Sequence, residues 1–169
     1  AYSYCRDALN RGTYHPRMME AVSDGPQGNS CCVCGTPALE FKEDNGIPFR
    51  KCPGCGTIER TRATLSWIGD NIDLRDLDIF SVAPAGATTR FIQTAEPRSY
   101  SRCDIRAIND YELQANISNM PEVGSESYDL VIAVKVLEHC NDDIAAMAEL
   151  HRILKPGGRL IIVGDITKD

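Results

Sequence analysis

The sequence predicts a doubly wound α/β domain preceded by a small cysteine-rich module. Residues 129–134 (DLVIAV) and 159–163 (RLIIV) are nearly continuous apolar runs rich in β-branched residues, which is typical of strands buried on both faces of a parallel sheet. A segment with apolar residues at helical spacing lies between them, so the three segments form a strand–helix–strand crossover. Upstream, two Cys-x-x-Cys pairs predict the module.

The crossover helix is expected to begin at Asn141 or Asp142, because a short side-chain oxygen can accept hydrogen bonds from the first free N–H groups. Pro156-Gly157-Gly158 is expected to end the helix and to turn the chain into the second strand. The apolar stripe predicted along this helix consists of Ile144, Met147, Leu150 or His151, and Leu154.

Length and composition limit the classes of protein to which this chain can belong. The 169 residues suffice for one ordinary domain and a small module. The net charge of −6 argues against a large nucleic-acid partner, because gripping a phosphate backbone needs a positive surface. No apolar run is long enough to cross a bilayer, and the first ten residues lack a secretory pattern, so we expect a cytoplasmic protein without a membrane partner.

The two cysteine pairs have the spacing of a zinc ribbon. Eight cysteines in such a chain indicate metal ligation rather than disulfides. Zn²⁺ takes four ligands in a tetrahedron, and two cysteines separated by two residues both reach it from one tight turn. Four thiolates leave no open position for substrate, so the zinc is expected to be structural. The predicted ligands are Cys31, Cys34, Cys52 and Cys55.

Two alternatives at the cysteines stay open. Cys32 is expected to be a bystander. Only one residue separates it from Cys34, and two cysteines at that spacing are poorly placed to bind the same ion. Four free thiols or a redox pair are the competing interpretation, although a redox motif does not need the second pair. Between the pairs, the chain alternates like a hairpin around the turn Asp44-Asn45-Gly46.

A helix is expected at residues 63–72, after the second cysteine pair. It either docks the ribbon onto the following domain or presents its arginines to an anionic partner, and docking is the more economical account. Its apolar side is expected to be formed by Ile58, Leu65, Ile68 and Ile72.

The α/β domain is expected to begin with a strand over residues 77–83. A turn of small residues (84–89) and a helix ending before Pro97 follow. In a doubly wound fold, this turn is where the polar part of a nucleotide-like ligand binds. The second strand, residues 99–103, leads into Asp104, whose carboxylate is placed to accept hydrogen bonds from a ribose diol or, alternatively, to cap a turn.

From Phe49 to Gly164, about two thirds of the chain, the sequence resembles a bacterial family of class I S-adenosylmethionine-dependent methyltransferases with an N-terminal zinc ribbon. The matching stretches are RKCPGCGTIERTR, FSVAPAG, YSRCDI, YDLVIAVKVLEHCNDD and ELHRILKPGGRLIIV. The resemblance implies a Rossmann-like sheet with strand order 3-2-1-4-5-7-6. It also suggests four parts: an N-terminal extension (1–30), a zinc ribbon (31–56), a linker helix (57–75) and an S-adenosylmethionine-binding domain (76–169).

The resemblance assigns roles to individual residues. Asp104 would hold the ribose hydroxyls, and Asn116, in a third strand at residues 112–117, would face the adenine amino group. Glu138 and His139 would open onto the pocket of the methyl acceptor. The turn that would pass under the methionine moiety is Ala83-Pro84-Ala85-Gly86, and the residues that would line the far side of the cofactor are Lys135, Val136 and Leu137.

The sequence departs from this family in three places. Relatives commonly carry an acidic residue where Ala85 stands and an aspartate where Asn116 stands, so we expect a reduced affinity for the cationic cofactor. The sequence given stops at Asp169, before the sixth and seventh strands of the family. A fragment, a minimal variant and a partner chain that supplies these strands are all open. Because the fifth-strand edge at residues 160–162 is apolar, we expect a second copy or a partner chain to cover it.

The expected function is methyl transfer from S-adenosylmethionine to a small molecule or a saccharide. If the acceptor must lose a proton, His139 is the first candidate base and Glu138 the second, although His139 is equally suited to lining the pocket. A non-catalytic binding or scaffold module is the first alternative. The second is an RNA-base methyltransferase that grips RNA through Arg50, Lys51, Arg60 and Arg62.

Overall fold

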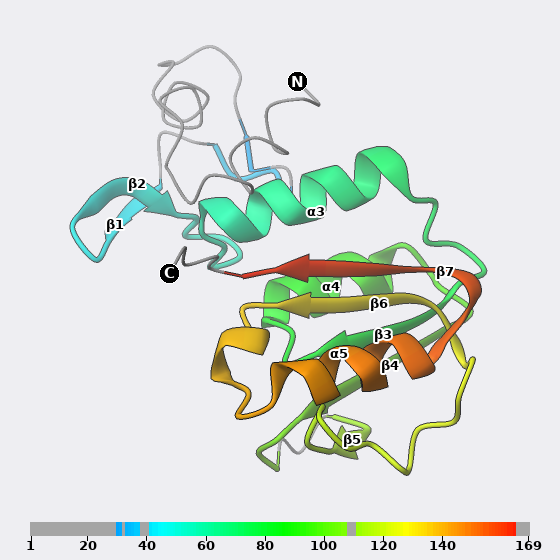
Figure 1. The fold of residues 1–169 in the computed structure, drawn as a ribbon. Helices are drawn as coiled ribbons and strands as arrows, with labels where there is room; N and C mark the ends of the chain where they lie inside the picture. The colour runs from blue at the N-terminus through cyan, green and yellow to red at the C-terminus, as the bar shows by residue number, and fades with distance from the viewer. Residues whose placement is uncertain (1–29, 32, 38–40, 108–110, 165–169) are drawn as a thin grey trace. The chain divides into compact units, whose positions relative to one another are not determined.

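The computed structural model describes residues 30–31, 33–37, 41–107 and 111–164 (Figure 1). The chain divides into two compact units, and the boundary lies between Asp73 and Leu74. The predicted extension over residues 1–30 lies outside the described residues except for Ser30, and so does the predicted bystander Cys32. Within the described residues, no helix combines the length and the apolar composition that crossing a membrane requires.

The described part of the first unit contains a hairpin and one long helix. Strands β1 (Lys42–Asp44) and β2 (Ile47–Lys51) pair in antiparallel fashion. Asn45 and Gly46 between them have φ angles of 52° and 76°, as the turn chemistry of an Asn-Gly pair predicts. Helix α3 (Glu59–Asn71) begins four residues earlier than the pattern indicates. Of the predicted apolar side of this helix, Leu65, Ile68 and Ile72 are buried and Ile58 is half-buried.

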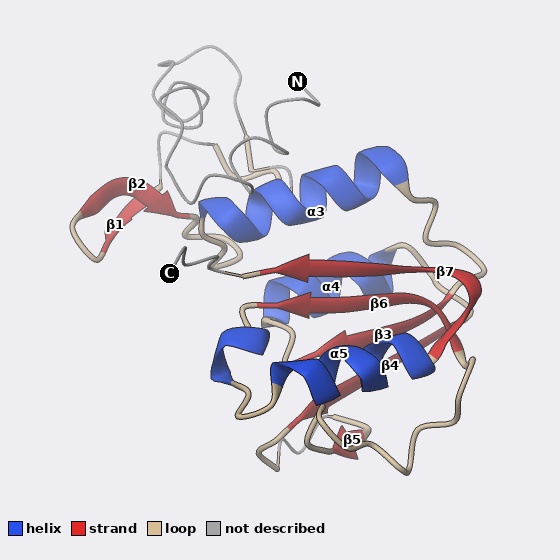
Figure 2. Ribbon diagram, in the orientation of Figure 1, coloured by secondary structure: helices blue, strands red, loops and turns tan. Residues whose placement is uncertain are grey.

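The second unit is a five-stranded, entirely parallel sheet with strand order β5-β4-β3-β6-β7. Counted within this unit, that order is 3-2-1-4-5, so the predicted doubly wound fold is confirmed for these strands. Helix α4 covers one face of the sheet and helix α5 the other (Figures 1 and 2). The strands are β3 (Asp78–Val82), β4 (Ser99–Asp104), β5 (Leu113–Gln114), β6 (Tyr128–Val134) and β7 (Leu154–Val163); the helices are α4 (Gly86–Thr94), α5 (Asp143–Arg152) and the 3-10 turn η2 (Leu137–His139).

The prediction for the buried face of α5 is confirmed at Leu150 but is wrong at Ile144 and Met147. The helix begins as expected, with the Asp142 carboxylate accepting a hydrogen bond from the Ala145 amide at 2.8 Å. However, the side chain of Ile144 is 76% exposed and that of Met147 is 38% exposed. Alanines carry little weight in a hydrophobic pattern, yet a small residue lets a helix approach a sheet closely. The residues of this segment that enter the core are Ala146, Leu150 and Ile153.

The Pro-Gly-Gly sequence forms a bulge within β7 instead of a separate turn. Helix α5 has already ended at Arg152. Tyr128 of β6 pairs with Leu154, and Leu130 pairs with Arg159, so four residues of β7 lie opposite a single residue of β6. A side chain at Gly158 would lie 2.9 Å from a backbone oxygen, which explains why a glycine is needed there.

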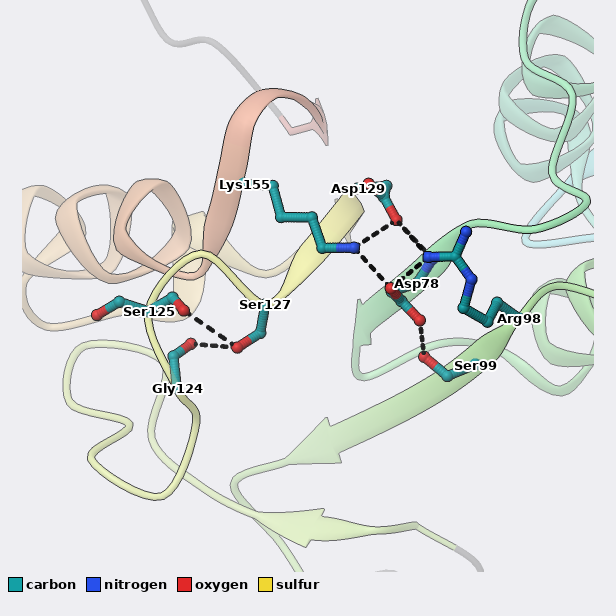
Figure 3. Close-up of polar contacts among 8 residues, drawn as sticks. All are labelled: Asp78, Arg98, Ser99, Gly124, Ser125, Ser127, Asp129 and Lys155. Atoms are coloured by element: carbon teal, nitrogen blue, oxygen red, sulfur yellow. Dashed lines mark hydrogen bonds and ion pairs between the residues drawn. The ribbon is translucent and has the colours of Figure 1, made fainter.

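A polar network ties four strands together at the amino edge of the sheet (Figure 3). Nζ of Lys155 lies 2.6 Å from Oδ2 of Asp78 and 2.8 Å from Oδ2 of Asp129. The Arg98 guanidinium donates to Asp78 at 3.0 Å, and the Ser99 hydroxyl donates to the same carboxylate at 2.7 Å. The Lys155 ammonium holds the pKa of Asp78 down to about 2. These charges compensate one another at the edge opposite the predicted ligand site.

The outer strands differ in extent from the prediction. Strand β5 covers only Leu113–Gln114, although a strand over residues 112–117 was expected. Strand β7 forms the other edge of the sheet. On it Ile162 is 37% exposed, whereas Leu160 and Ile161 are partly buried.

Candidate cofactor site and cysteine cluster

The loop after β3 lies at the carboxyl edge of the sheet, beside the point where the strand order reverses. Ala83 adopts a φ of +44°, and its amide donates to the Cys103 carbonyl on β4 at 2.7 Å. Ala85 precedes α4 without a capping side chain. A Cβ placed on Gly86 would meet nothing nearer than the Arg90 guanidinium at 3.8 Å. The backbone of this loop is therefore open to close approach by a ligand.

Asp104 ends β4 at the same edge, with its side chain only 6% exposed. Oδ1 accepts from the Arg106 amide at 2.9 Å and from Arg106 Nε at 3.1 Å. Oδ2 accepts from Arg106 Nη2 at 3.0 Å. These hydrogen bonds hold the pKa of Asp104 below its ordinary value, against the opposing effect of burial. The carboxylate is thus ionised at neutral pH, and a neighbouring arginine engages both of its oxygens.

The chain beyond β4 is also tied to the β3–α4 loop. The Tyr111 hydroxyl donates to the Pro84 carbonyl at 2.6 Å. The Arg102 guanidinium lies 5.0 Å from the centre of the Tyr111 ring and donates to Glu112 at 2.8 Å. These contacts fix one side of the loop that the sequence predicts to bind cofactor.

The segment after β6 lies at the same carboxyl edge, on the side of β3 away from β4. Lys135 has a φ of +56°, and its amide donates to the Val163 carbonyl of β7 at 2.6 Å. Its ammonium pairs with the Glu138 carboxylate at 2.5 Å. Glu138 and His139 belong to η2, and both residues are exposed. Val136 and Leu137 are partly buried and pack against the core of the sheet.

Adjacent strands bring most of the predicted cofactor residues to one edge. Strand β3 lies between β4 and β6, and the three are parallel, so the loop after β3, Asp104 and the segment after β6 share the carboxyl edge. Asn116 lies farther out, beyond the short β5, where its Oδ1 accepts from the Ser118 amide at 3.0 Å. Its role towards adenine stays a prediction.

The four predicted cysteine ligands form a cluster in the first unit. Their Sγ atoms all lie within 4.8 Å of one another. Sγ of Cys31 is 3.6 Å from that of Cys55, and Sγ of Cys34 is 3.5 Å from that of Cys52. A tetrahedral Zn²⁺ with sulfur ligands at about 2.3 Å would separate the sulfurs by about 3.8 Å. The donor set therefore fits a tetrahedral ion.

The two cysteine turns have equivalent backbone hydrogen bonds, and in each of them a threonine hydroxyl lies close to a thiol. The Gly35 amide donates to the Cys31 carbonyl at 2.7 Å, and the Gly56 amide donates to the Cys52 carbonyl at 2.8 Å. The two glycines have φ angles of 75° and 74°, which suit glycine. The hydroxyl after each glycine lies close to a thiol: Thr36 Oγ1 to Cys34 Sγ at 3.1 Å, and Thr57 Oγ1 to Cys55 Sγ at 3.0 Å.

Two thiols of the cluster have strongly shifted pKa values. Burial alone would raise the pKa of Cys34, but hydrogen bonds from Thr36 and from neighbouring thiols lower it to about 6. Burial raises the pKa of Cys55 to about 12, and the nearby Cys34 and Cys31 add to this effect. A divalent cation would favour the thiolate form of Cys55.

Two of the arginines proposed for RNA binding serve the structure of the first unit. Arg62 is buried, and its Nη1 donates to the Thr57 carbonyl at 2.6 Å and to the Arg50 carbonyl at 3.0 Å. Its guanidinium also lies 4.5 Å from the centre of the Phe41 ring. Arg50 donates to Glu59 at 3.0 Å. These contacts hold the second cysteine turn against α3 and leave the two guanidinium groups poorly suited to a nucleic acid.

A sequence model described as "methyltransferase domain" matches residues 54–162. The chain belongs to this methyltransferase family. The match begins within the second cysteine turn and runs nearly to the end of β7, so it includes every residue predicted to contact the cofactor.

Known proteins agree with this assignment at the level of the fold. A structure from Methanococcus maripaludis, described as that of an S-adenosyl-L-methionine-dependent methyltransferase, is 19% identical; the match covers 60% of this chain and 53% of that one, with a TM-score of 0.52. The YcgJ protein from Bacillus subtilis is 18% identical, with coverages of 59% and 49% and a TM-score of 0.50. The chain therefore spans about half the length of these solved structures.

A curated relative is far larger than this methyltransferase-family chain. Fumosorinone synthetase from Cordyceps fumosorosea is 27% identical over 109 residues, which are 64% of this chain and 2% of that protein. The match covers so little of the synthetase that its product does not indicate the methyl acceptor of this chain.

Four residues that contribute to these sites were not predicted from the sequence. Arg106 carries a signal, because an aspartate in a turn often accepts from the amide two residues later. Thr36 and Thr57 also carry one, since Cys-x-x-Cys-Gly-Thr occurs twice. No local spacing indicates Tyr111, whose partner Pro84 lies 27 residues earlier in the chain.

Proposed function

We propose that this protein transfers a methyl group from S-adenosylmethionine to a small molecule or a saccharide, and that a structural zinc ion organises its first unit. The observation that carries the proposal is the meeting of the open β3–α4 loop and the buried Asp104 carboxylate at the carboxyl edge of the sheet. Family membership supports it independently.

The residues at this edge suit an adenosyl ligand. The two oxygens of Asp104 match a ribose diol, which offers two hydroxyl donors. The Ala83–Gly86 loop would take the amino-acid portion, because its backbone lies open beside the start of α4. The Lys135–Leu137 segment would close the far side of the adenosyl group. When bound, S-adenosylmethionine supplies an already activated methyl group, so this chain's residues mainly align the acceptor.

Two side chains are placed to handle an acceptor proton. His139 is exposed in η2, so an imidazole nitrogen is available to accept the proton of a hydroxyl or amine acceptor. Glu138 is less available, because its carboxylate pairs with the Lys135 ammonium. A Cβ at Gly164 would lie 3.3 Å from Glu138 Oε2, which places this carboxylate beside the end of β7. We therefore assign His139 as the base and Glu138 as a positioning residue.

The cysteine cluster supports the zinc proposal. Its four Sγ atoms would ligate the ion, and the Thr36 and Thr57 hydroxyls would stabilise the thiolates by donating to them. Metal analysis of the purified protein should find one zinc ion per chain. Cys52→Ser should lose it, whereas Cys140→Ser, outside the cluster, should retain it. Equal zinc content in the two variants would contradict the proposal.

Calorimetric titration with S-adenosylhomocysteine tests the cofactor assignment. We expect saturable binding to the wild-type protein. Glu138→Gln and His139→Asn should bind with unchanged affinity but should slow methyl transfer to a responsive acceptor, and His139→Asn should lose more activity. The absence of heat and of a thermal shift at high ligand concentration would favour a non-catalytic scaffold instead.

A salt titration of RNA binding tests the remaining alternative, an RNA-base methyltransferase. That function predicts RNA binding that weakens steeply with salt. We expect no such binding, because Arg62 is buried and Arg50 is paired with Glu59.

A further inference from the structure

Arg106 occupies the hydrogen-bonding positions that a ribose would need. A carboxylate oxygen offers about two lone-pair positions. Oδ1 of Asp104 already accepts from the Arg106 amide and from Arg106 Nε, and Oδ2 accepts from Arg106 Nη2. A ribose diol that donates to both oxygens therefore finds no free position on Oδ1.

The two partners differ in how freely they move. The Asp104 side chain is 6% exposed and ends a strand in the middle of the edge, so its position is fixed. The Arg106 side chain is 75% exposed, beyond the end of that strand. Displacing the guanidinium into water leaves its charge solvated, and the ribose hydroxyls would then satisfy the Asp104 carboxylate that it leaves.

We propose that Arg106 competes with the ribose for Asp104 and thereby sets the affinity of the site for adenosyl ligands. This inference rests on the proposed function, because it names the step that precedes binding there. In the structure the site is in its self-paired form, and the ligand binds only to the fraction of molecules in which the guanidinium has left. The Arg106 amide stays on Oδ1 in either form, and release of the guanidinium frees one position on each oxygen of Asp104.

Adenosine is the most selective probe of this competition, because it carries the ribose diol without net charge. Arg106→Met keeps a long side chain but removes the guanidinium donors. We expect adenosine to bind Arg106→Met about two- to fivefold more tightly than the wild type, which is the range that an exposed ion pair supplies. Arg159→Met, at an exposed position of β7, removes the same charge and should leave the affinity unchanged.

Two further measurements identify the cause. With 2′-deoxyadenosine, which lacks one hydroxyl of the ribose diol, the gain in Arg106→Met should be much smaller. Raising the ionic strength from about 0.05 M to about 0.5 M should tighten adenosine binding to the wild type, because salt screens the Arg106–Asp104 pair, and should leave Arg106→Met unaffected.

The outcomes separate this inference from the proposed function. Unchanged or weaker adenosine binding in Arg106→Met, with binding retained in the wild type, would overturn the competition alone. An equal gain for adenosine and 2′-deoxyadenosine would also overturn it. If neither protein binds adenosine or S-adenosylhomocysteine, the proposed function fails, and the inference fails with it.

Discussion

The two edges of the parallel sheet hold their charges in different ways. At the amino edge, Asp78 and Asp129 share the Lys155 ammonium, and these three residues come from three neighbouring strands. At the carboxyl edge, Asp104 pairs with Arg106, which is two residues away in sequence and largely exposed. The first arrangement requires the folded sheet, whereas the second needs only a local turn.

This difference distinguishes a structural ion network from an exchangeable one. Breaking the amino-edge network leaves carboxylates facing each other across strands that cannot move apart. Breaking the carboxyl-edge pair lets the arginine turn into solvent, and the buried carboxylate becomes available to another donor. Substitutions at the amino edge should therefore change stability, and substitutions at the carboxyl edge should change binding.

The largest expected effect is at the carboxyl edge. Asp104→Asn should weaken S-adenosylhomocysteine binding about 100-fold, because two hydrogen bonds to a charged acceptor are replaced by weaker or mismatched ones. The midpoint of urea unfolding should change little, because the Arg106 guanidinium that loses its charged partner is already largely exposed. Calorimetry and urea titration measure the two quantities. Asp70→Asn, at an exposed position of α3, is the matched control. A variant that unfolds easily but binds normally would reverse the comparison.

The next effect is at the amino edge. Lys155→Met should lower the free energy of unfolding, because two carboxylates lose their shared cation. Arg98 stays close to both and limits the loss. Affinity for S-adenosylhomocysteine should not change. Lys42→Met, at an exposed position of β1, provides the control for removing a lysine. Equal stability of the two variants would show that the network contributes nothing.

A smaller effect should appear in the pH dependence of stability. The Lys155 ammonium lowers the pKa of Asp78 to about 2, so the folded state binds this proton less readily than the unfolded state. The stabilisation is present above the unfolded pKa of about 4 and disappears as the pH falls towards 2. We expect about 1–2 kcal/mol between these limits, after allowance for solvent screening. Denaturant titrations at several pH values should show a shallower dependence in Lys155→Met; parallel curves would exclude Asp78 as the source.

The smallest effect concerns a single hydroxyl. Ser99→Ala removes a 2.7 Å hydrogen bond to Asp78 Oδ1 at an exposed position. We expect a loss of about 0.5–1 kcal/mol in urea unfolding, because Lys155 and Arg98 still hold the carboxylate. Ser101→Ala, on the same strand, is the control. A loss as large as that in Lys155→Met would mean that the hydroxyl, and not the charge, organises this edge.

The sequence predicted the sheet well because its strands are continuous apolar runs joined by short crossovers. Residues 129–134 lie in β6, and residues 77–83 include all of β3. Once these strands are parallel, chain order alone brings Asp104 and the segment at Lys135 to the same edge. The four cysteines were equally accessible to prediction, because ligand spacing within a turn is a local property.

What escaped prediction depends on interactions that local spacing does not encode. The buried face of α5 depends on Ala146, which an apolar pattern scarcely registers. Lys155 reaches Asp78, which lies 77 residues earlier in the chain. The turn-capping alternative for Asp104 is confirmed by the Arg106 amide, but the hydrogen bonds from the Arg106 guanidinium to both carboxylate oxygens were not predicted.

The bulge in β7 also determines the orientation of the residues that follow it. Side chains alternate between the faces of a strand. Removing one residue from the bulge and keeping the upstream pair would shift the later residues by one position against β6, and each later side chain would turn to the opposite face. Val163 is buried and its neighbour Ile162 is exposed, so such a deletion would place the wrong residue inside. The Lys-Pro-Gly-Gly insertion thus sets the phase of the last strand, and its length is constrained even though its glycines contribute no side chains to the core.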